Sequence, residues 1–193
     1  GRLARAQTCL RESLVTARRL RDRVFEAQSL FSLGLIDALR GEPTRAEALL
    51  EESIDIARES SPLMVAFALL THGLARYVAG DLNGCRPRLV EALALARKMS
   101  LPWVTSWSLA FLGNAARMSG CLDEADEHIQ EALALMKSKG LRTDVPIDAG
   151  AGLARAVGDL DLAESLHHDA LKTALAIDSV LLVPAHFESL AGL

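Results

Sequence analysis

The amino-acid sequence predicts an all-α protein, a solenoid of antiparallel helix hairpins. Half of the 193 residues are hydrophobic but only 4% are aromatic. The apolar residues are mainly leucine and alanine, which favour helices. In addition, one segment recurs five times along the chain, and recurrence at a fixed period is typical of solenoids. We therefore expect about four and a half repeats of 38–41 residues.

Each copy of the recurring segment begins with a glycine. Positions five, nine and twelve residues after it are small or apolar, except that His167 takes the middle position of the fifth copy. These spacings fall on one face of a helix, so each copy predicts one amphipathic helix. The opening glycine suits the positive φ that ends the preceding helix. The glycines are Gly1, Gly41, Gly80, Gly120 and Gly158.

A second helix is expected between consecutive copies. The expected spans are residues 23–40, 62–79, 102–119 and 145–157, and a fifth from residue 180. Three spans carry Gly34, Gly73 or Gly113 inside an apolar stretch, and Ala151 takes that place in the fourth. A glycine inside a helix costs about 1 kcal/mol relative to alanine. We expect the close approach of the following helix, whose small residue lies twelve positions on, to offset this cost.

One residue interrupts the third copy of the recurring segment. Pro87 stands where a helix interior is expected, and proline there removes a hydrogen bond and clashes with the carbonyl four residues back. The sequence predicts that this helix starts late, capped near Asn83, or bends in its first turn.

The glycine inside the second helix resembles the leucine–glycine pair of the tetratricopeptide repeat, whose period is about 34 residues. Leu33–Gly34 and Leu112–Gly113 carry the pair, whereas His72–Gly73 departs from it. The period here is longer, so longer helices are expected.

The segments ALLEESIDIARES, VEALALARKM, IQEALALMK and LLVPAHFESLAGL resemble a narrower group. They are similar to the tetratricopeptide-like C-terminal regions of large bacterial transcription regulators of LuxR and related signal-transduction ATPase type. The resemblance covers nearly the whole chain. It implies a cytoplasmic regulatory module that binds a protein, a peptide segment or a small-molecule effector. The alternative is a structural scaffold or homodimerisation array without a sensing role.

The chain begins inside one hairpin and stops inside another, so we expect residues 1–193 to be a single repeat domain from a longer protein. Its net charge of −4 argues against direct binding of nucleic acid. No apolar run approaches the 20 residues of a membrane span. The three cysteines suit a reducing compartment. No phosphate-binding loop or catalytic constellation is present, so neither an enzyme nor a cofactor is predicted.

No metal site is predicted either. His72 and His167 take positions that are leucine or isoleucine in other copies, so we expect both in the core, with His168 in solvent. A metal needs three or four converging ligands. The acidic residues, Glu51 and Glu52 among them, are interpreted as helix-end charges or as a solvated outer face.

The N-terminal segment is basic. Residues 1–23 carry seven arginines and two acids. This pattern fits a solvated face, or a docking surface for an acidic element.

The glycine-bearing helices should line the concave face of the array. Their side chains either form a binding groove for an amphipathic helix or a small effector, or pack neighbouring repeats. The candidate groove residues are Gln28, Phe31, Phe67, Leu70, Leu74, Tyr77, Trp103, Trp107, Asn114 and Arg117.

Overall fold

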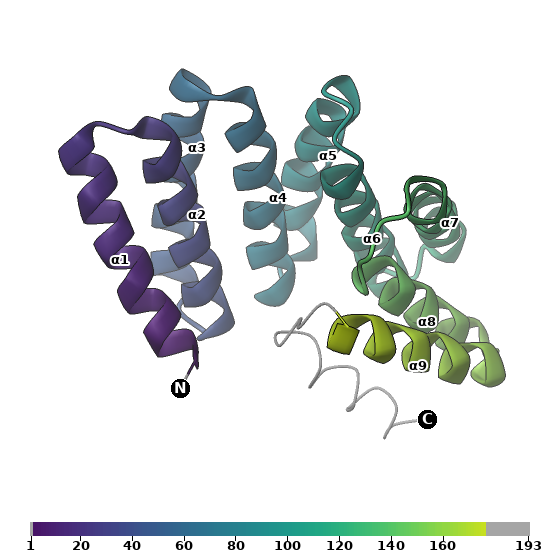
Figure 1. The fold of residues 1–193 in the computed structure, drawn as a ribbon. Coiled ribbons are helices and arrows are strands. Elements are labelled where there is room, and N and C mark those ends of the chain that lie inside the picture. Colours follow the sequence, from purple (N-terminus) through teal and green to yellow (C-terminus); the bar gives the residue numbers. More distant parts are fainter. Residues whose placement is uncertain (1, 177–193) are drawn as a thin grey trace. The chain divides into compact units, whose positions relative to one another are not determined.

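The computed structural model describes residues 2–176, which form nine α-helices and no strand (Figure 1). Consecutive helices pack as antiparallel pairs, which confirms the predicted fold class. The helices are α1 (Arg2–Leu20), α2 (Arg23–Leu39), α3 (Pro43–Ser60), α4 (Pro62–Val78), α5 (Leu82–Lys98), α6 (Pro102–Met118), α7 (Leu122–Lys139), α8 (Val145–Val157) and α9 (Leu160–Ala176). The expected fifth span, from residue 180, lies outside the described residues.

The chain divides into two compact units, and each is described by itself. The first unit, residues 1–100, contains α1 to α5. The second unit, residues 101–193, contains α6 to α9 in its described part. In this text, α2, α4, α6 and α8 are the A helices, and α1, α3, α5, α7 and α9 are the B helices.

Glycines end the A helices as predicted. The backbone φ angles of Gly41, Gly80, Gly120 and Gly158 are 76°, 79°, 80° and 89°. Residues with a side chain rarely adopt this left-handed conformation, so glycine at these positions lets the chain turn directly into the next helix.

The glycines inside the A helices lie at helix crossings, also as predicted. A Cβ atom added at Gly73 would lie 2.6 Å from the side chain of Leu89, and one at Gly34 would lie 2.7 Å from that of Leu50. The crossing differs in one detail from the expectation. The residue over the glycine is the large apolar one at the ninth position of the copy, while the small residue Ala46 contributes its backbone oxygen. The absent side chain therefore makes room for a leucine.

The core of the first unit follows this register. Leu30, Leu50, Ile54, Leu69 and Leu89 are fully buried between the A and B helices. Helix α2 contacts both α3 and the next A helix, α4. Burial of each such side chain contributes about 1.5–3 kcal/mol.

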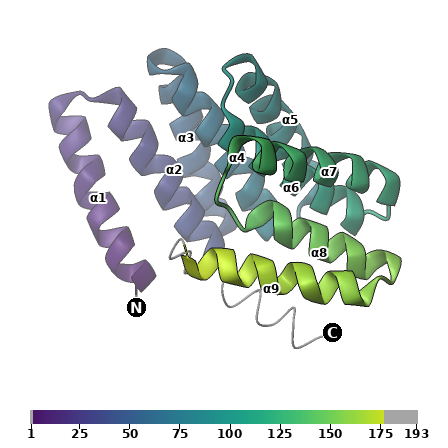
Figure 2. The same cartoon turned by 45° about the vertical axis from the view of Figure 1, so that its right-hand side comes forward.

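The second unit contains an irregular hairpin. Helices α8 and α9 lie antiparallel and side by side (Figure 2). Helix α8 has 13 residues, whereas α2, α4 and α6 have 17 each. Residues 140–144 replace the missing first turn and connect α7 to α8. This longer connection creates the pocket described below.

The expected late start of the helix containing Pro87 is wrong. Helix α5 begins at Leu82, and its N-cap is Asp81, whose carboxylate accepts a hydrogen bond from the Gly84 amide at 2.8 Å. A carboxylate at the N-terminus stabilises the first turn. Pro87 therefore lies inside a helix that starts before it. Because proline has no backbone N–H, the helix lacks the hydrogen bond from position 87 to the carbonyl of Asn83.

Two further sequence expectations concern the chain as a whole. Within residues 2–176, no helix combines the length and apolar character needed to cross a membrane. Cys9, Cys85 and Cys121 are all free thiols.

Candidate functional site

The A-helix face of the first unit carries a pair of aromatic rings. Phe31 on α2 and Phe67 on α4 stack with their centroids 6.5 Å apart and their planes 17° apart. Both are partly exposed. Phe31 also packs against the core cluster of Ala38, Ala46, Leu50 and Ala75. The pair therefore has one side on the core and one side on the surface.

The other predicted groove residues of this unit differ in exposure. Gln28 is exposed, and Leu74 and Tyr77 are partly exposed. Leu70 is only 3% exposed, so it belongs to the core and offers no binding surface. Gln28 lies three residues before Phe31 on the same face of α2, and Phe31 stacks on Phe67, so the three side chains form a mixed polar and aromatic strip.

In the second unit the two predicted tryptophans of α6 differ in exposure, because Trp103 is 37% exposed and Trp107 is partly buried. Trp107 lies between Trp103, at a centroid distance of 4.3 Å, and Phe111, at 6.1 Å. Its indole Nε1 donates a hydrogen bond of 2.8 Å to Thr143 Oγ1 in the connection before α8. Trp107 therefore anchors this connection to α6.

Arg117 connects α6 to α8, and Asn114 on α6 holds its side chain. Asn114 is 7% exposed, and its Oδ1 accepts hydrogen bonds from the Arg117 guanidinium at 3.3 and 3.4 Å. A Cβ atom added at Gly152 would lie 3.2 Å from Arg117 Nε. The guanidinium therefore covers a glycine of α8, and Asn114 offers little free surface.

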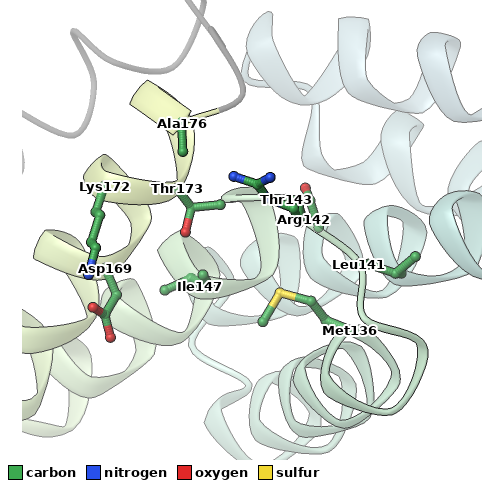
Figure 3. Close-up of a pocket in the computed structure, with 9 residues that line it drawn as sticks. All are labelled: Met136, Leu141, Arg142, Thr143, Ile147, Asp169, Lys172, Thr173 and Ala176. Carbon is green, nitrogen blue, oxygen red and sulfur yellow. The ribbon is translucent and has the colours of Figure 1, made fainter.

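The pocket of the second unit has a volume of about 380 Å³ (Figure 3). It lies between the end of α7, the connection before α8, and α9. Its lining residues are Met136, Leu141, Arg142, Thr143, Ile147, Asp169, Lys172, Thr173 and Ala176.

The pocket combines an apolar base with charged groups at its rim. In Figure 3 the Arg142 guanidinium extends toward Thr173, while Asp169 and Lys172 lie together on α9. Among the described residues, the side chains of Arg142, Asp169 and Lys172 have neither an ion pair nor a hydrogen bond. Sequence reasoning missed this pocket, although the shortened fourth A helix was a visible sign of irregularity.

A cluster of charged groups joins α3, α4 and α5 in the first unit. His72 on α4 is fully buried, and its Nε2 lies 2.8 Å from Glu47 Oε2 and 3.0 Å from Arg76 Nε. Nε2 donates to Glu47 only when it carries hydrogen and accepts from Arg76 only when it does not, so the two bonds are alternatives. Nδ1 has no hydrogen-bond partner and lies 3.8 Å from Glu51 Oε1.

Burial determines the charge state of this histidine. It lowers the pKa of the His72 imidazole below its ordinary value, and the Glu47 carboxylate only partly offsets the effect. His72 is therefore neutral near pH 7. Burial alone would raise the pKa of the Glu47 carboxyl, but its polar contacts outweigh burial and lower that pKa. Because His72 is neutral, Arg76 supplies the positive charge that keeps Glu47 ionised.

The same cluster contains the residue types of a cation site. Glu47, Glu51 and His72 place three ligand atoms within 4.8 Å of one another. However, Arg76 binds the Glu47 carboxylate and Arg88 binds that of Glu51. Two guanidinium groups already neutralise the carboxylates, so the arrangement fits an ion-pair cluster between repeats better than a metal centre.

The histidines lie where the sequence placed them, but their surroundings were missed. His167 is 3% exposed and faces Asp148 at 3.5 Å, and His168 is exposed. The expected outer-face role of Glu51 is wrong, because it packs toward α4 and α5. The sequence signal for this contact was the spacing of Glu47 and Glu51 by four residues, which places both on one face of α3.

Residues 1–59 match the family model of the tetratricopeptide repeat. This match covers α1, α2 and most of α3, including the crossing at Gly34. Together with the nine helices in antiparallel pairs, it identifies the fold as one of tetratricopeptide repeats. A search of curated proteins finds no match to the chain.

Several solved structures share the fold, and two of them are compared with the chain. BtubC from P. vanneervenii has a TM-score of 0.71 and 16% identity, over 100% of this chain and 88% of that protein. Aspartyl phosphate phosphatase F from Bacillus subtilis has a TM-score of 0.72 and 11% identity, over 93% of this chain. The match spans 48% of the phosphatase, about half its length. At these identities the likeness concerns the fold alone.

Proposed function

We propose that the chain is an interaction module that binds a peptide segment of a partner protein along α2 and α4. The observation that carries this proposal is the partly exposed stacked pair Phe31–Phe67 beside the exposed Gln28. Aromatic side chains supply large contact areas at interfaces, and the glutamine amide can bond a peptide backbone.

The repeat fold supports the same proposal. Tetratricopeptide repeats typically mediate protein–protein interaction. The role proposed here is binding without catalysis.

The finer part of the proposal concerns the parent protein. We propose that the module serves a cytoplasmic transcription regulator of the LuxR type and responds to an effector. The support is the resemblance of the recurring segments, such as VEALALARKM, to that group.

We propose that a small effector binds in the pocket beside α9. Arg142 and Lys172 suit a carboxylate, and Met136 and Ile147 suit an apolar group. A panel of short-chain carboxylates and apolar amino acids, tested by thermal shift, should include a compound that stabilises the protein. The stabilisation should be lost in Arg142→Ala. If no compound shifts the melting temperature, or if Arg142→Ala responds equally, the assignment is wrong.

A peptide selection tests the main proposal. A displayed library of random 16-residue peptides is selected on the full chain, and the affinity of enriched peptides is measured by fluorescence anisotropy. We expect enriched peptides to lose at least tenfold in affinity for Phe67→Ala. No enrichment, or equal affinity for the variant, would contradict binding along α2 and α4.

A further inference from the structure

The B helices share a pattern of charges. Every copy of the recurring segment has an acid eleven residues after its opening glycine, and the first four copies have a base seventeen residues after it. The acids are Glu12, Glu52, Glu91, Glu131 and Asp169, and the bases are Arg18, Arg58, Arg97 and Lys137. In the first unit, Arg18 Nη2 lies 2.5 Å from Glu52 on α3, and Arg58 Nη2 lies 3.6 Å from Glu91 on α5. Helices α3 and α5 thus each bind an arginine of the preceding B helix.

The equivalent pair is missing between α7 and α9. By the same register Lys137 of α7 should pair with Asp169 of α9, yet among the described residues neither side chain has an ion pair or a hydrogen bond. Asp169 instead lines the pocket of about 380 Å³ beside α9. It therefore has the position of an acid that binds arginine, with a cavity beside it.

A second departure from the repeat occurs at the same pocket. The residue sixteen positions after the opening glycine is alanine in the other four copies, and all four alanines are buried. The fourth copy has Met136, which is partly exposed and lines the pocket. The irregular connection of residues 140–144 forms another side of it. The sequence thus differs from the repeat where the pocket lies.

The charged groups of the lining are separated by an apolar one. In the view of Figure 3, Ile147 lies between the Arg142 guanidinium and the Asp169 carboxylate. A ligand that pairs with both charges needs an anion and a cation joined by an apolar stem. Guanidinium and carboxylate groups pair through two parallel hydrogen bonds. The third charged residue of the lining, Lys172, is exposed, so solvent screens its charge.

We propose that the pocket beside α9 binds a basic amino acid of the arginine type, with its side-chain cation on Asp169 and its carboxylate on Arg142. Its methylene stem lies along Ile147 and Met136. The guanidinium of the ligand takes the place of the arginine that the preceding B helix supplies in the first unit. This inference rests on the proposed effector site and names the class of its ligand.

The probes are L-arginine, L-citrulline and agmatine, because citrulline keeps the shape of arginine without its side-chain charge and agmatine lacks the carboxylate. Their dissociation constants are measured by isothermal titration calorimetry on the full chain. The protein variants are Asp169→Asn and its matched control Asp161→Asn, which changes an acid of α9 outside the pocket lining. Both acids are exposed, so both variants should fold, and circular dichroism checks this.

We expect arginine to bind at least tenfold more tightly than citrulline or agmatine. Asp169→Asn should remove the preference for arginine over citrulline, and Asp161→Asn should leave it unchanged. Arg142→Ala should bind arginine as weakly as the wild type binds agmatine. Equal affinity of the wild type for arginine and citrulline, or a preference that persists in Asp169→Asn, would overturn the inference.

Two outcomes separate this inference from the proposed effector site. If short-chain carboxylates stabilise the protein but arginine and citrulline bind equally, the effector site stands and the inference is wrong. If neither these carboxylates nor arginine bind, both are wrong.

Discussion

At the scale of single residues, the absence of a side chain at Gly73 determines how closely α4 approaches α5. Leu89 fills the space above this glycine, with its Cγ and Cδ2 atoms 2.6 Å from where a Cβ atom would lie. Gly150 in α8 differs, because its Cβ atom would meet Leu133 at 3.4 Å and Leu166 at 3.5 Å, an ordinary contact. The two glycines therefore form a matched pair for mutation.

Gly73→Ala should destabilise the protein by about 1–3 kcal/mol, because a buried leucine must move. Gly150→Ala should stabilise it by about 0.5–1 kcal/mol, because alanine favours the helix and fits the space. Urea unfolding of both variants gives the two free energies. If the two substitutions change the free energy of unfolding in the same direction, the described helix crossing is wrong.

His72 should make stability depend on pH. Its folded-state pKa is below the ordinary value, so the unfolded chain binds more protons as pH falls through about 6.5, and the fold loses stability. The pKa of Glu47 is also lowered, so its protonation also reduces the stability of the fold as pH falls, but nearer pH 4. The charged groups that face the imidazole are Glu47, Glu51, Arg76 and Arg88.

The expected result is that His72→Gln loses less stability than the wild type between about pH 7.5 and about pH 5. Urea unfolding at both pH values measures the difference. An equal loss in both proteins would show that the imidazole is not held neutral by burial.

At the scale of elements, the connection between α7 and α8 depends on one hydrogen bond from α6. Trp107→Phe removes the Nε1 donor to Thr143, and Thr143→Val removes the acceptor. Each should cost about 0.5–1.5 kcal/mol, and the double variant should cost less than the sum, because the bond is lost only once. Strictly additive free energies of unfolding would mean that this hydrogen bond does not hold the connection.

Sequence periodicity was sufficient to predict the helices, since the expected A-helix spans end within one residue of the observed ones. The late start expected at Pro87 is wrong because Asp81 caps α5 earlier, while the alternative, a bend in the first turn, stays a prediction. The periodicity also did not predict that Glu51 lies near His72, because a contact between repeats depends on how adjacent helices pack. Side-chain register on one helix gives the face of a residue but not its partner.

At the scale of the whole molecule, the described part combines a repeat core with two surfaces that the core does not require. One is the strip of Gln28, Phe31 and Phe67 in the first unit, and the other is the pocket beside α9 in the second. Of the four predicted groove residues on α6, Trp107, Asn114 and Arg117 form hydrogen bonds within the second unit, whereas Trp103 is 37% exposed. The proposed peptide site is therefore the one on α2 and α4.

The most direct test of this assignment measures stability and peptide affinity together. Gln28→Ala and its matched control Gln130→Ala, an exposed glutamine on a B helix, are compared with the wild type using a selected 16-residue peptide. Both variants should unfold within about 0.5 kcal/mol of the wild type, as surface substitutions do. Only Gln28→Ala should bind the peptide at least fivefold more weakly. If Gln28→Ala and Gln130→Ala bind as the wild type does, while Phe67→Ala loses more than about 3 kcal/mol of stability, the strip serves packing and the chain is a scaffold.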